Sequence, residues 1–342
     1  MSVYALSFHA NYACRHSGAC CTAGWSIPVE PRLLPLLGVD VLVPKPDGAC
    51  VHFDTGSRLC AVQRDHGENM LPGSCHQFPR RALIDERGTF VALSNFCPTA
   101  AMLLCESDTP FGIVRSPIAF PEDRLYEGID ARGQWPPLVR PGVLFDLESY
   151  SQWEQFVIAT LASGGRVDAA LAQIAGAAEA LRTWKPDFGP FEKWLAHALS
   201  QPVAANDALN RYERFRTIEA YNRLRQFVPD GLIAAGPAPC DSAVPGLDGR
   251  DHHAIARRYL ASKAFASWSA YEGHGIRTLV AELLVSDLVL RVECDRSSRA
   301  SGQPLDRSLM VEAVRQSDLF LIHLLDRPRM IEWLGQVEAI AD

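Results

Sequence analysis

Hydrophobic and polar positions follow two different patterns along the 342 residues of this chain. From about residue 145 onward, apolar residues recur every three to four positions, as in "ESYSQWEQFVIATLAS" and "RVDAALAQIAGAAEALRTW". This spacing places apolar side chains on one face of a helix. Gly-Pro breaks near 188–190 and 229–250 interrupt the pattern. We therefore predict a helical bundle domain over 143–342.

The first 110 residues lack this helical period. Short apolar runs such as "VDVLVPKP" and "GTFVALSNF" alternate with stretches rich in glycine and proline, which is typical of short strands and loops. Proline is dense between 111 and 142, where it fixes φ and removes backbone donors. The predicted fold class is therefore mainly α: an irregular cysteine-rich metal-binding N-terminal domain with short strands (1–110), a Pro-rich connection (111–142) and the helical bundle domain.

Charge and hydropathy exclude two partner classes. The net charge is −7 and the basic residues are scattered, so we expect no nucleic-acid partner. No stretch reaches the roughly 18 apolar residues of a membrane span. The first residues, "MSVYALSFHANYACRHSG", lack a basic stretch followed by an apolar run, so we expect a cytoplasmic protein.

Cysteine is unevenly distributed, with eight of the ten cysteines in the first 105 residues. In a reducing compartment, such a cluster indicates metal binding or redox chemistry more than disulfides. Cys105, Cys240 and Cys294 are expected to be packing or surface residues. The candidate metal ligands are the other seven: Cys14, Cys20, Cys21, Cys50, Cys60, Cys75 and Cys97.

Thiolates are soft anionic ligands for zinc or iron, and a folded scaffold has to hold several of them together against their mutual repulsion. The glycines and prolines that flank these cysteines suit tight ligand loops. Histidine could complete the site, and His76, directly after Cys75, is the best placed of four in this region. Two other interpretations remain: cysteines packed as small apolar residues, and structural disulfides in a secreted chain.

No other catalytic motif accounts for the chain. It contains no Gly-x-Ser-x-Gly elbow, phosphate-binding loop or His-Glu-x-x-His sequence. The glycine-containing stretches "LASGGRVDAA" and "YEGHGIRT" lack the spacing of a dinucleotide-type turn, which counts against a conventional doubly wound methyltransferase fold. Asp146 and Glu148 are expected to cap a helix.

Three segments, read in order, carry a resemblance to a known family: "CRHSGACCTAGWSI", "CVHFDTGSRLCAVQRDHGENMLPGSCHQFPRR" and "LSNFCPTAAMLL". The chain resembles the CxxCxxCC cysteine-cluster family, described as zinc- or iron-chelating, and is most similar to its flagellin lysine-N-methylase branch. Ser17 stands where the family has the second cysteine of the motif, so seven matching cysteines remain instead of eight.

The resemblance implies an iron–sulfur cluster, such as 4Fe-4S, or zinc as cofactor. It also implies methyl transfer from S-adenosylmethionine to lysines of a protein or peptide substrate such as flagellin. There are two alternatives. The first is a non-catalytic binding module in which the metal has only a structural role, and the second is a metal delivery or sensing protein. An enzyme should have a pocket that joins the metal centre to the helical region, whereas a purely structural metal site should be closed and remote from any cleft.

Overall fold

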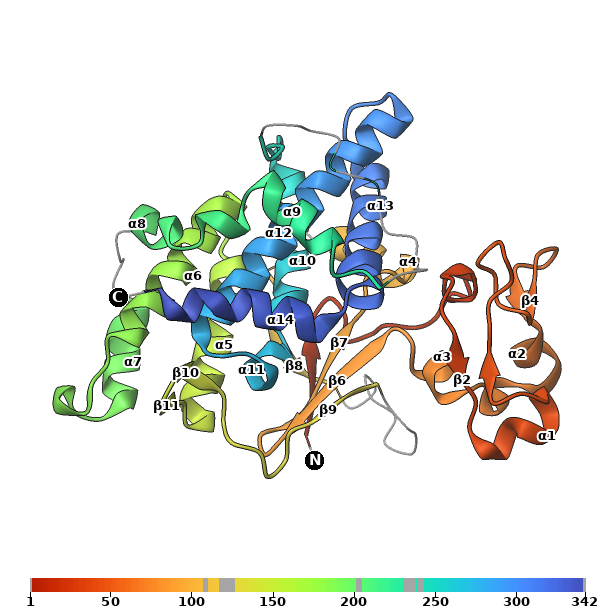
Figure 1. Ribbon diagram of the computed structural model, residues 1–342, viewed down its shortest axis with the longest axis horizontal. Helices are drawn as coiled ribbons and strands as arrows, with labels where there is room; N and C mark the ends of the chain where they lie inside the picture. Colours follow the sequence, from red (N-terminus) through yellow and green to blue (C-terminus); the bar gives the residue numbers. More distant parts are fainter. Residues whose placement is uncertain are drawn as a thin grey trace.

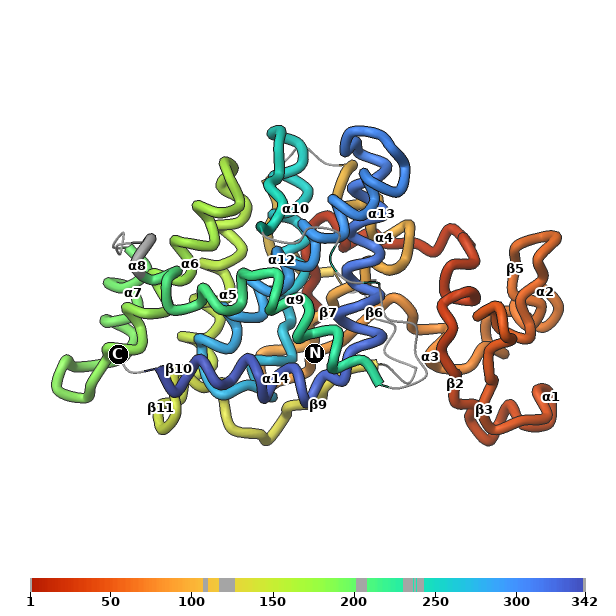
Figure 2. The backbone as a smooth tube through the Cα atoms, turned by 45° about the horizontal axis from the view of Figure 1, so that its top comes forward, coloured from red at the N-terminus to blue at the C-terminus, as the bar shows by residue number. Residues whose placement is uncertain are grey.

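The computed structural model describes residues 2–106, 110–116, 127–200, 205–229, 236, 238 and 243–340. The protein is mainly helical, as the apolar period predicts, and it also contains one five-stranded sheet. A small lobe at the N-terminal side stands apart from the helical body in both overall views (Figures 1 and 2). Within the described ranges, no helix combines the length and apolar character of a membrane span.

The body is built on helices that begin at residue 147. The longest, α12 (Ile276–Ser301), packs against α6, α10 and α13 and is buried along most of its length. The helices of this region are α5 (Leu147–Ala162), α6 (Val167–Arg182), α7 (Phe191–Ser200), α8 (Ala205–Asn210), α9 (Ile218–Arg225), α10 (Arg250–Ala264), α11 (Ser269–Glu272), α12, α13 (Arg307–Asp318) and α14 (Arg327–Gly335). A π-helical turn, η7 (Leu319–Leu324), follows α13, and β10 (Leu138–Arg140) and β11 (Val143–Leu144) form a hairpin before α5.

The sheet joins the N-terminal part of the chain to these helices. Its order is β8-β1-β7-β6-β9, with β1 (Val3–Leu6), β6 (Arg80–Asp85), β7 (Gly88–Leu93), β8 (Ile113–Arg115) and β9 (Gly128–Asp130). Alternate side chains face opposite sides of a strand, so Leu83 and Phe90 enter the main helical core while Ala82 and Val91 form a small cluster with Val3. Residues 1–110 are therefore divided between the body and the lobe.

The lobe contains the elements from η1 to α3, and α4 (Pro98–Glu106) returns to the body, where it packs against α10 and α13. The elements of the lobe are short: η1 (Ala19–Thr22), β2 (Ile27–Pro28), α1 (Leu34–Leu37), β3 (Val41–Leu42), β4 (Phe53–Asp54), β5 (Leu59–Cys60), α2 (Ala61–His66) and α3 (Gly73–Gln77). Its own apolar core is small and centres on Val29, Leu33 and Leu42. Turns and backbone hydrogen bonds thus carry much of its structure.

The Pro-rich segment 111–142 has a role beyond connection, because it supplies both edge strands of the sheet. β8 pairs antiparallel with β1, and β9 pairs parallel with β6. Neither three-residue strand contains proline, so every residue of β8 and β9 keeps its backbone N–H. These groups are available for pairing with β1 and β6.

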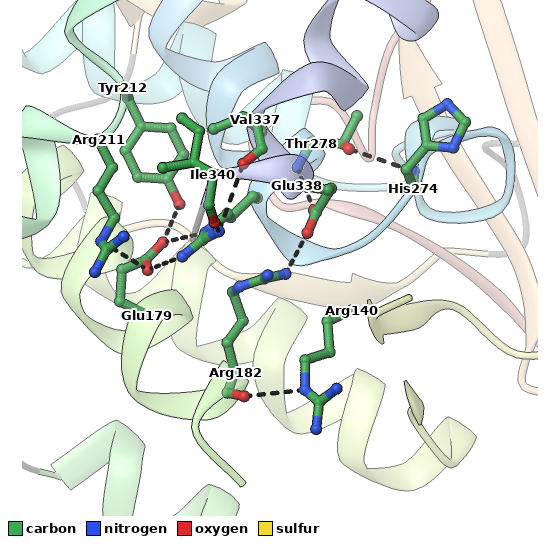
Figure 3. A network of polar contacts seen from close by, with 11 residues as sticks. Arg140, Glu179, Arg182, Arg211, Tyr212, His274, Thr278, Val337, Glu338 and Ile340 are labelled. Carbon is green, nitrogen blue, oxygen red and sulfur yellow. Dashed lines mark hydrogen bonds and ion pairs between the residues drawn. The ribbon is translucent and has the colours of Figure 1, made fainter. Parts of the chain in front are cut away.

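Buried ion pairs tie the ends of the helical body together. Arg277, which is fully buried at the start of α12, donates two hydrogen bonds to Glu179 of α6, at 2.9 and 2.6 Å, and one to the carbonyl oxygen of Ile340, at 2.7 Å. Tyr212 and Arg211 also contact Glu179, at 2.9 and 3.2 Å (Figure 3). The carboxylate of Glu179 therefore connects three parts of the body.

The cap of α5 provides a first quantitative prediction. Asp146 is the N-cap residue, as expected from the sequence, and its carboxylate accepts a hydrogen bond from the backbone N–H of Ser149 at 2.8 Å. Asp146→Ala should lower the free energy of unfolding by about 1 kcal/mol, measured by urea denaturation. Glu148→Ala is the control, because Glu148 is exposed in the first turn. Equal losses in the two variants would contradict the capping role.

Candidate functional site

One cavity of about 510 Å³ is bounded by the lobe and the adjoining part of the body. All the cysteines predicted as ligands line it: Cys14, Cys20, Cys21, Cys50, Cys60, Cys75 and Cys97. They come from separate segments of the chain, and Cys97 lies beyond the lobe, just after β7. The fold therefore brings the whole predicted set to one space.

The vicinal cysteines lie on η1, a single turn that begins after Gly18. Gly18 has a φ of 74°, and a Cβ atom there would come within 2.8 Å of the Phe53 ring, so only glycine fits. The N–H of Cys21 donates to the Gly18 carbonyl at 3.0 Å, which closes the turn. The N–H of Cys50 donates to the Cys21 carbonyl at 2.7 Å. These backbone bonds bring Cys50 beside the vicinal pair.

Cys60 is held at the start of a helix. It is the N-cap residue of α2, and the backbone N–H groups of Val62 and Gln63 lie near enough to its thiol to favour the thiolate. The hydrogen bond with Cys21, together with these N–H groups, lowers the pKa of Cys60 to about 6, although burial acts in the opposite direction. Cys60 is therefore prepared to ionise, which a metal ligand requires.

Five thiols of the lobe interact with one another, and we call them the lobe group: Cys20, Cys21, Cys50, Cys60 and Cys75. Burial raises the pKa of Cys75, and the nearby thiolates of Cys20, Cys50 and Cys60 raise it further. Hydrogen bonds with Cys20 and Cys60 raise the pKa of Cys21. Such mutual repulsion is what a bound cation relieves.

The other two cysteines lie where the lobe meets the body. The Tyr12 hydroxyl is 3.4 Å from the Cys97 sulfur. Burial raises the pKa of Cys14, which also experiences the charges of Cys20 and Cys97. The Nδ1 atom of His16 is 4.0 Å from the Cys14 sulfur. Five thiols thus form the lobe group, and the remaining two are Cys14 and Cys97, of which Cys14 also interacts with Cys20 of the lobe group.

The other residues that the sequence analysis singled out lie partly in the cavity wall and partly in the helical body. His76 lines the cavity, and its Nε2 atom is 3.0 Å from a carboxylate oxygen of Glu68. Ser17, which replaces the family's cysteine, also lines the cavity, and its hydroxyl accepts a hydrogen bond from the N–H of Ala19 at 3.5 Å. Cys294 is buried in α12 with its sulfur 3.4 Å from that of Met310, as expected of a packing residue. Cys240 lies outside the described residues.

Sequence reasoning missed His323, which lines the same cavity from η7. Its ring lies 4.7 Å from that of Trp25 and about 6 Å from those of Phe78 and Phe96. Its Nε2 atom is 2.7 Å from the hydroxyl of Ser94. The only local sign of this role is a single histidine within the apolar run "LFLIHLL", and that pattern also fits a core position.

Body helices hold the turn that carries Ser94 and leads to Cys97. The N–H of Asn95 donates to Asp318 at 2.5 Å, and its side-chain amide donates to Ser262 at 3.0 Å. Asp318 is fully buried and forms an ion pair with Lys263 of α10. One side of the cavity is therefore positioned from within the body.

Two histidines near this turn, His9, which is buried, and His323, which is partly exposed, predict sensitivity to acid. Burial, aided by nearby cations, lowers the pKa of both His9 and His323 to about 3. Since the unfolded chain binds protons near pH 6.5 and the folded chain only near pH 3, stability should fall progressively as the pH drops below about 6.5. Urea denaturation at several pH values tests this. The His9→Gln variant should lose less stability on acidification than the wild type, and an unchanged slope would contradict the assignment.

The seven cysteine thiols around the cavity are the ligand type that zinc and iron–sulfur clusters use, although their side chains are not arranged with the geometry of a metal-binding site. In the described part of the chain, no three His, Cys, Asp or Glu side chains are arranged to hold a metal ion. Soft sulfur ligands in this number around one cavity suit an iron–sulfur cluster or zinc. Comparison with family models, with curated proteins and with solved structures gave no match.

Proposed function

We propose that the lobe binds a thiolate-ligated metal centre, either an iron–sulfur cluster or zinc. The observation that carries the proposal is that all seven predicted cysteines line one cavity. The lobe group would supply the ligands, since four thiolates complete a cluster or a zinc site. When bound, the centre supplies electron transfer or Lewis-acid chemistry, depending on the metal. Cys14 and Cys97 would lie at its border with the body.

We further propose that the chain is an enzyme, in which the metal has a role beyond stabilising the loops. The cavity extends from the thiols to His323 and Arg80 of the body, which supports an enzyme because a closed structural site would have no such extension. The resemblance names the reaction as methyl transfer from S-adenosylmethionine to lysines of a protein or peptide substrate such as flagellin. In this proposal, the chain's own residues bind and orient the substrate beside the metal centre.

Metal analysis tests the first part. The protein should be purified without oxygen and assayed for iron, zinc and sulfide, and its absorption spectrum should be recorded. Stoichiometric iron and sulfide with a broad band at about 400 nm identifies a cluster, and tightly bound zinc identifies a zinc site. Folded protein without either metal contradicts the proposal.

Methyl transfer is tested separately. The metal-containing protein should transfer labelled methyl groups from S-adenosylmethionine to flagellin or to lysine-containing peptides, measured by mass spectrometry. The same substrates with lysines acetylated serve as the control. Metal-containing protein that transfers no methyl group to any of them would reject this reaction and leave the metal assignment in place.

A further inference from the structure

The cavity is larger than a metal centre alone requires, and its second end has a different chemistry. A volume of about 510 Å³ lies in the range of small-molecule sites. One end carries the lobe group of thiols. The other, which we call the aromatic end, is lined by Tyr12, Trp25, Phe78, Ile322 and His323.

Partly exposed rings form the walls of the aromatic end. Trp25 and Phe78 come from the lobe, and their ring centroids are 5.6 Å apart. His323 comes from the body, with its centroid 4.7 Å from that of Trp25. All three side chains remain partly exposed while lining the cavity. Flat apolar groups pack well against such walls, by offset stacking or edge-to-face contact.

The hydrogen bonds around Ser94 indicate which nitrogen of His323 carries the proton. The N–H of Phe96 donates to the Ser94 hydroxyl oxygen at 3.4 Å. Among the described residues, the remaining partner of that hydroxyl is Nε2 of His323, at 2.7 Å. The serine proton is therefore best satisfied by donation to Nε2, which leaves the proton of the neutral ring on Nδ1. Nδ1 has no partner within the described ranges and can donate to a ligand.

The charges around His323 favour an anionic acceptor. Arg81 and Lys263, the latter paired with Asp318, lie near enough for their charges to lower the pKa of its imidazole ring. Arg80 lines the same cavity, with its guanidinium carbon 5.4 Å from the centre of the Tyr12 ring. Glu127 also lines this region, where burial raises the pKa of its carboxyl group and the charge of Arg81 opposes that rise. A carboxylate oxygen at Nδ1 would therefore meet a hydrogen-bond donor in a positive environment.

We propose that the aromatic end binds an aromatic or heteroaromatic carboxylate, with its ring against Trp25 and Phe78 and its carboxylate on Nδ1–H of His323. This inference rests on the proposed function in that it names the ligand class of the same cavity. The geometry of the aromatic end depends on the walls and on Ser94, and it does not require a particular metal.

The test uses the full chain and two probes of equal shape, indole-3-carboxylate and its neutral amide, indole-3-carboxamide. Titration calorimetry and saturation-transfer NMR should show the carboxylate binding with a dissociation constant on the order of millimolar or tighter. The amide should bind about tenfold more weakly, because it lacks the charge-assisted hydrogen bond. Equal affinities, or no binding of the carboxylate, would overturn the proposal.

Two variants at one position locate the interaction. His323→Leu removes the donor and should weaken carboxylate binding about tenfold, while the amide should lose less affinity because its carbonyl oxygen gives up only a neutral hydrogen bond. His323→Gln retains an N–H donor and should recover part of the loss. Circular dichroism and the melting temperature establish that each variant is folded. If folded His323→Leu keeps wild-type affinity and Trp25→Ala does too, the ligand lies elsewhere and the proposal fails.

Metal content measured on the same samples separates the two proposals. Stoichiometric metal without carboxylate binding rejects the aromatic ligand site alone. Carboxylate binding that depends on His323, in protein without metal, supports the ligand site and rejects the metal centre.

Discussion

Cys60→Ser is expected to reduce the metal bound to the protein at least about tenfold, because it replaces the thiol that the lobe prepares best for ionisation. The thiol of Cys21 and, to a smaller extent, two N–H groups at the start of α2 lower the pKa of Cys60 to about 6. A serine hydroxyl stays protonated under the same conditions and is a weak ligand for zinc or iron. Since the lobe has only a small apolar core, loss of metal should also lower its resistance to proteolysis. Elemental analysis and limited trypsin digestion measure both effects.

Cys294→Ser is the matched control for this change. Cys294 is a buried cysteine in α12, packed against Met310 and absent from the cavity wall. We expect this variant to keep its metal, although placing a hydroxyl in an apolar site lowers its stability. Full metal content in Cys60→Ser, or equal losses of metal in the two variants, would remove Cys60 from the proposed ligands.

Glu179→Leu is expected to lower the free energy of unfolding by about 3–5 kcal/mol, since it removes one partner of a buried ion pair. Arg277 is fully buried, and Glu179 accepts two of its hydrogen bonds. In the variant, the guanidinium group keeps carbonyl contacts, such as that with Ile340, but loses the carboxylate of Glu179. Urea denaturation monitored by circular dichroism measures the loss.

Two further variants show whether the buried charge is the cause. Asp295→Ala breaks the pair between Asp295 and Arg299, whose side chain is 59% exposed, and should cost less than about 0.5 kcal/mol. The double variant Glu179→Leu with Arg277→Met removes both charges and should recover a large part of the stability. If the double variant loses as much as the sum of the single changes, the ion pair is not the origin of the effect.

Local pattern was sufficient to predict much of the helical body. The apolar period of "ESYSQWEQFVIATLAS" corresponds to α5, and the helix begins after the predicted cap at Asp146. The run "GTFVALSNF" contains β7. Such elements are predictable because a helix or strand that buries one face repeats apolar residues at its own period.

Pairing between distant segments was not predictable in this way. The sheet takes β1, β6 and β7 from the cysteine-containing third of the chain and its edges from the Pro-rich segment 111–142. A three-residue strand has too little pattern to be recognised, and its partner is chosen by which sheet edge lies open. The division between lobe and body, before η1 and after α3, follows from this pairing.

By itself, the sequence determined the helices of the body, the set of candidate cysteine ligands and the glycines in the turns that carry these cysteines. Those properties depend on residue identity and short-range spacing. Only the tertiary structure decided that seven cysteines share one cavity, that Cys14 and Cys97 lie apart from the lobe group, and that His323 joins them across more than 200 positions of the chain. Contacts of that kind depend on which buried faces and sheet edges meet during folding. No local pattern encodes them, because each partner is also compatible with an ordinary place in the core.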